Sequence, residues 1–133
     1  GKLASDLVEL EGFRVLAELA QEASRTADRL VAAAARVHPD IDRIERVGAE
    51  IEAIDQRVVE LGLVHPEIKI LTQMFKFGKE NVEGEGILSL ARQHARLYHD
   101  LGIAAQQMTR LLETDSVEHA LEGEADGNRS LRQ

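Results

Sequence analysis

Residues 44–61 decide the fold, and they read IERVGAEIEAIDQRVVEL. Aliphatic side chains recur here at steps of three and four residues, at Ile44, Val47, Ile51, Ile54, Val58 and Leu61. This spacing is typical of an α-helix with a coiled-coil seam of a and d positions. The charged residues in between, Asp55 among them, are expected on the solvent-facing sides. We therefore predict a helix over about 39–61 that ends at Gly62.

Similar spacing predicts a long helix on each side of this stretch. The first covers about 6–37, starting at Asp6 and stopping before Pro39, and its expected core positions are Leu16, Leu19, Ala23, Leu30, Ala33 and Val37. The second covers about 87–113, with the seam Ile87, Leu90, His94, Leu97, Leu101, Ala104, Met108 and Leu111. Alanines crowd the middle of the first helix, and small residues there permit a neighbouring helix to approach closely.

The rest of the chain supplies one short element and a tail. Pro66 in a first turn and Gly78 after Phe77 predict a short helix over 66–77. Residues 114–133 carry many acids and little periodicity, so we expect an acidic, flexible tail beyond a bundle domain of residues 1–113. The predicted fold is all-α, an antiparallel bundle of three long helices plus one short helix. Unequal helix lengths leave about Leu3 to Phe13 without a partner in the chain, which favours a homodimer or contact with a missing domain.

Composition and charge exclude several classes of function. The 24 acidic and 16 basic side chains give a net charge of -8, which disfavours nucleic acid as a partner. Charges interrupt every apolar run before the ~18 residues of a membrane span, so no membrane insertion is expected. The start, Gly1 to Asp6, has neither an initiator Met nor a signal-peptide pattern, so we expect an excised fragment of a cytoplasmic protein. The Ala/Arg/Glu-rich bias suggests a bacterial source.

The predicted short helix carries the strongest candidate binding surface. Three of the four lysines and two of the four aromatic residues of the chain lie in or beside it, in the set Lys69, Met74, Phe75, Lys76, Phe77 and Lys79. Aromatic anchors beside steering charges are typical of protein-docking patches, here for an acidic, apolar partner. The alternative is that the phenylalanines close one end of the core while the lysines keep that end soluble.

His99 is a candidate phosphoacceptor. It lies on the solvent-facing side of the last predicted helix and is followed by Asp100 and Leu101. This His-Asp-Leu step resembles, over three residues, the phosphoacceptor box of histidine-kinase dimerisation domains and related phosphotransfer proteins. That resemblance implies phosphotransfer to His99 by a separate kinase. The chain departs from the box at Gly102-Ile103-Ala104, where the family has a basic residue, a small residue and Pro. The alternative is an ordinary surface histidine.

His94 and Tyr98 form a possible polar site in the core, because His94 occupies a seam position. Such a histidine is either a structural group or part of a small-molecule sensor.

No metal or other cofactor is expected, since His38 and His65 stand at opposite ends of a helix about 33 Å long. No Ser-His-Asp order, glycine-rich phosphate loop or HExxH motif is present, so we do not expect an enzyme. The preferred function is a non-catalytic interaction module, regulatory, adaptor or secretion-related, that binds through 66–77 and the exposed part of the first helix.

Overall fold

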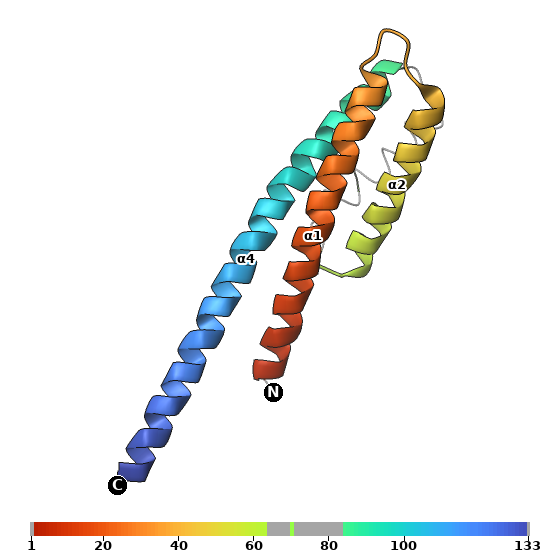
Figure 1. Cartoon of the computed structure of the whole chain (residues 1–133). Helices are drawn as coiled ribbons and strands as arrows, with labels where there is room; N and C mark the ends of the chain where they lie inside the picture. Colours follow the sequence, from red (N-terminus) through yellow and green to blue (C-terminus); the bar gives the residue numbers. More distant parts are fainter. Residues whose placement is uncertain (1, 64–69, 71–83, 133) are drawn as a thin grey trace.

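The computed structural model describes residues 2–63, 70 and 84–132, with side chains over 7–63, at 70 and over 86–115. These residues form α1 (Lys2–Ala34), α2 (Ile41–Glu60) and α4 (Gly84–Arg132), and they contain no strand. Figure 1 shows α1 antiparallel to both other helices, and α1 packs against each of them. The predicted all-α bundle is therefore confirmed for this part of the chain. The predicted helix at 66–77 lies, apart from Ile70, outside the described residues.

The ends of α2 follow from local chemistry. The Asp40 carboxylate accepts a hydrogen bond from the Arg43 backbone N–H at 3.2 Å, which satisfies one of the unpaired donors at the helix start. At the other end Gly62 has a φ of 69°, a left-handed conformation that residues with a Cβ rarely adopt. Its N–H donates to the Val59 carbonyl at 3.1 Å. The predicted stop at Gly62 is confirmed.

The seam of α2 is buried as predicted. Ile44, Val47, Ile51, Ile54 and Val58 are all in the core. The first three belong to a cluster with Leu30 and Ile87, and the last two to a cluster with Leu16, Leu19 and Tyr98. The predicted core position Val37 is wrong: α1 ends at Ala34, so Val37 falls in the connection to α2 and is 93% exposed. α1 also begins at Lys2, before the predicted start at Asp6.

The face that α4 presents to α1 differs from the predicted seam. Ile87 and His94 are buried, but Ala104, Met108 and Leu111 are exposed. Their places in the core are taken by smaller residues and one tyrosine, namely Ala91, Tyr98, Gly102 and Ala105. A Cβ on Gly102 would meet the Cβ of Ala20 at 3.5 Å, so the two helices approach closely there. The alanines of α1 permit this approach, as predicted.

Unequal helix lengths shape one end of the molecule. At ~1.5 Å per residue, α4 with 49 residues extends ~73 Å, against ~50 Å for the 33 residues of α1 and ~30 Å for the 20 of α2. α4 continues as a helix through Arg132, where the sequence predicts a non-helical tail from residue 114. In Figure 1 both α1 and α4 project past the end of α2. The division into a bundle domain and a tail stays a prediction.

The first part of α1 is not wholly without a partner, contrary to the prediction for Leu3 to Phe13. Leu10 is buried, and the Arg14 guanidinium donates to the Glu113 carboxylate of α4 at 2.7 Å. The segment is therefore partly packed, and α4 reaches α1 at Arg14, immediately after the segment ends. Within the described residues, none of the helices combines the length and apolar character that a membrane span requires.

Candidate functional site

A buried polar cluster links α2 to α4. We call Asp55, His94 and Tyr98 the Asp55 network; each side chain is at most 1% exposed. The Tyr98 hydroxyl donates to Asp55 Oδ1, and His94 Nε2 lies 3.2 Å from Asp55 Oδ2. The His94 and Tyr98 rings are tilted by 40°, with centroids 5.9 Å apart. One carboxylate of α2 thus holds two side chains that lie one turn apart on α4.

The hydrogen bonds of the His94 ring both run to acceptors. Nδ1 lies 3.2 Å from the Leu90 carbonyl oxygen, while Nε2 faces the Asp55 carboxylate. Which nitrogen carries a proton depends on the tautomer, and the Asp55 carboxylate accepts a hydrogen bond wherever Nε2 carries one. Polar groups buried this deeply are tolerated only when they are hydrogen-bonded. In the described part of the chain, no buried side-chain nitrogen or oxygen lacks a partner.

Tyr98 remains a donor over the whole physiological pH range. Burial of the phenol raises its pKa most, and the negative charge of Asp55 and the hydrogen bond to it raise the pKa further. The phenolate form is therefore strongly disfavoured in the folded protein. The Asp55 network works as a fixed polar link in the core and leaves Tyr98 unsuited to accept or release a proton.

The sequence predicts part of this cluster. It indicates a possible polar site in the core at His94 and Tyr98, and in the structure both side chains are buried with their rings next to each other. Asp55 was expected in solvent, which is wrong, because it is completely buried. The spacing could have indicated this: Asp55 lies four residues after Ile51 and three before Val58, so it is on the helix face next to the seam. A core-facing helix often buries this neighbouring position together with the seam.

His99 lies on the outside of the bundle, as predicted, and lines a groove between α1 and α4. The groove has a volume of about 380 Å³. We call it the His99 groove; its lining residues are Ala20, Gln21, Ser24 and Arg25 of α1 and Tyr98, His99, Gly102, Ile103 and Gln106 of α4. Tyr98 therefore belongs both to this groove and to the Asp55 network.

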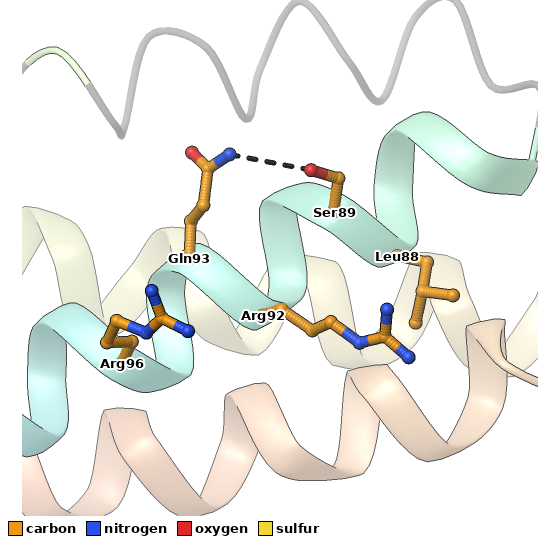
Figure 2. Close-up of a pocket in the computed structure, with 5 residues that line it drawn as sticks. All are labelled: Leu88, Ser89, Arg92, Gln93 and Arg96. Carbon is orange, nitrogen blue, oxygen red and sulfur yellow. Dashed lines mark hydrogen bonds between the residues drawn. The ribbon is translucent and has the colours of Figure 1, made fainter.

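A second hollow, of about 400 Å³, lies along the first turns of α4. Its described lining residues are Leu88, Ser89, Arg92, Gln93 and Arg96. Figure 2 shows the Gln93 amide beside the Ser89 hydroxyl, at 3.4 Å, on a different side of the helix from the Arg92 guanidinium. All of these described residues come from one helix, so they do not define a closed site.

Other predicted sites are tested only in part. The set Lys69, Met74, Phe75, Lys76, Phe77 and Lys79 lies outside the described residues, and so does His65. His38 is exposed in the connection between α1 and α2. No group of three or more His, Asp or Glu side chains in the described part could hold a metal ion together.

Comparison of the chain with protein-family models, curated proteins and solved structures finds no match.

Proposed function

We propose that the protein is a non-catalytic helical interaction module whose binding surface is the apolar face of α1 beyond α2. The observation that carries the proposal is the exposure of Leu7 and Val8, at 52% and 73% of their surface. Two adjacent aliphatic side chains that are both exposed leave continuous apolar surface, which is what a partner helix can cover. We call these two residues the open end.

Val8 continues a stripe that is already used for packing. Gly12, one turn later, faces Leu63, because a Cβ built on it would meet Leu63 Cδ1 at 2.9 Å. Leu19 is buried against Ile54 and Val58 of α2. The stripe therefore packs on α2 and on Leu63, and it is exposed at Val8. An amphipathic helix of a partner can occupy this position in the way that α2 occupies the adjacent one.

The partner surface extends, in this proposal, to the aromatic and lysine patch at 69–79, for which the sequence is the only support. A regulatory, adaptor or secretion-related role in a bacterial cytoplasm, and pairing with a second copy of the chain, belong to the same proposal. The sensor alternative finds less support, because the Asp55 network is occupied by bonds among its own members.

Photo-crosslinking tests the open end directly. A benzoylphenylalanine placed at Val8 in cells that make the chain should give one defined adduct, and its mass distinguishes a second copy from another protein. The matched control is the same probe at Val37, which is 93% exposed but lies at the other end of α1. Leu7→Asp should abolish the adduct. No adduct at position 8, or equal adducts at both positions, would refute the proposal.

Phosphotransfer to His99 is the second candidate function. It is favoured by the exposure of His99 beside Arg25 in the His99 groove. A guanidinium there can stabilise the incoming phosphoryl group while the neutral imidazole attacks it. Treatment with phosphoramidate followed by mass spectrometry at neutral pH should show phosphohistidine at position 99, lost in His99→Gln. Absence of that modification in the wild type argues against this candidate.

A further inference from the structure

The His99 groove is hollow because small residues form its floor. Ala20 and Gly102 meet there, and neither carries a side chain long enough to fill the space between α1 and α4. Tyr98 forms another part of the floor and is fixed by its hydrogen bond to Asp55. A groove of about 380 Å³ with such a floor is within the size range of small-molecule sites.

The polar rim of the groove is unusual for this acidic chain. Apart from the Tyr98 hydroxyl, which is bonded to Asp55, the polar groups of its lining residues are one guanidinium, one imidazole, two amides and one hydroxyl, from Arg25, His99, Gln21, Gln106 and Ser24. No carboxylate is among the described lining residues, although the whole chain has a net charge of -8. Arg25 is therefore the one always-charged group among these described lining residues.

Arg25 has no carboxylate partner within the described part of the chain. Arg14, Arg29 and Arg57 each form an ion pair with a glutamate, at 2.7, 2.8 and 3.8 Å, while Arg25 shares its unpaired state with further surface arginines of that part. The Arg25 side chain forms no ion pair or hydrogen bond within the described part of the chain, and neither does that of His99. Both groups retain their hydrogen-bonding capacity toward a ligand. Because arginine is always charged, the ligand that fits is an anion.

We propose that the His99 groove binds the phosphate group of a small phosphate monoester. The donor-bearing side chains of the lining can serve the three equivalent oxygens of a phosphate monoester, whose charge of about -2 also favours it over a singly charged carboxylate beside Arg25. The exposed side of Ile103, at the groove edge, supplies apolar surface for the organic part of the ester. This binding is reversible and requires neither transfer to His99 nor the open end.

Nuclear magnetic resonance of the histidine rings tests the site. Phenyl phosphate, inorganic phosphate and benzoate are titrated into the chain at a constant ionic strength of about 0.15 M, to equalise screening. We expect saturable shifts of the His99 ring signals with the two phosphates, while exposed His38 stays unchanged. Tighter binding of phenyl phosphate identifies an ester as the ligand, and equal affinity identifies the phosphate group alone; both support the site.

Variants separate the groove from general charge effects. Arg25→Gln should weaken phenyl phosphate binding about tenfold or more, as expected for loss of a charge-assisted hydrogen bond. Arg14→Gln removes the same charge from the same helix outside the groove and should leave the affinity unchanged. Thermal melts verify that both variants fold. Shifts that do not saturate, equal losses in the two variants, or benzoate binding as tight as phenyl phosphate would overturn the proposal.

Discussion

Replacing Asp55 by alanine should be among the most destabilising single changes in α2. The change removes the acceptor from both the Tyr98 hydroxyl and His94 Nε2, and the two donors stay buried. One unsatisfied buried polar group costs about 1–3 kcal/mol, and the change leaves two such groups on α4. We expect the free energy of unfolding to fall by ~2–5 kcal/mol, a large part of the ~5–15 kcal/mol typical of a domain.

Urea denaturation followed by circular dichroism measures this loss. Glu45→Ala is the matched control, because it removes one carboxylate from the same helix at an exposed position and should cost less than ~0.5 kcal/mol. A double-mutant cycle with Tyr98→Phe adds a second check: the tyrosine change should cost less once Asp55 is gone, with a coupling above ~0.5 kcal/mol. If Asp55→Ala is as mild as Glu45→Ala, or the cycle shows no coupling, the assignment of a buried network is wrong.

Three further changes test other parts of the fold. The pKa of Tyr98 is raised by burial and by Asp55, so an unfolded chain releases this proton near pH ~10 while the folded chain holds it. The resulting stability is fully present below pH ~10 and is lost above it by up to ~1.4 kcal/mol per pH unit. Denaturation of the wild type at pH 8–11 should show this slope above pH ~10, and the same measurement on Tyr98→Phe should not. Ile51→Asp should cost more than ~3 kcal/mol, because it buries an unpaired carboxylate, whereas Ala49→Asp on the exposed side should cost under ~1 kcal/mol; similar melting temperatures would contradict the orientation of α2. Gly62→Ala should lower the free energy of unfolding by ~1 kcal/mol, because its φ of 69° disfavours a Cβ, and a stabilised variant would show that α2 does not end there.

The two sides of the His99 groove differ in how well the sequence predicts them. Helical spacing predicts the exposure of His99, but it does not predict that His99 lies beside the face of α4 that packs on α1. Arg25 lies 74 residues earlier, and nothing in the sequence indicates that the two residues line one hollow. Their proximity depends on the register of α1 against α4, in which Ala20 lies against Gly102. Sequence spacing predicts the faces of one helix but does not predict which residues of two helices stand side by side.

The sequence by itself determined the features that depend on neighbours within one turn. The seam of α2 and its stop at Gly62 could be predicted because helical spacing and a left-handed glycine are local properties. Only the tertiary structure decided the burial of Asp55 and the face of α4. A carboxylate is buried only where another element brings donors to it, and Tyr98 and His94 come from a helix 39 or more residues away. Small residues such as Ala91, Gly102 and Ala105 become core only because the alanines of α1 permit close packing, which a rule based on large aliphatic side chains does not detect.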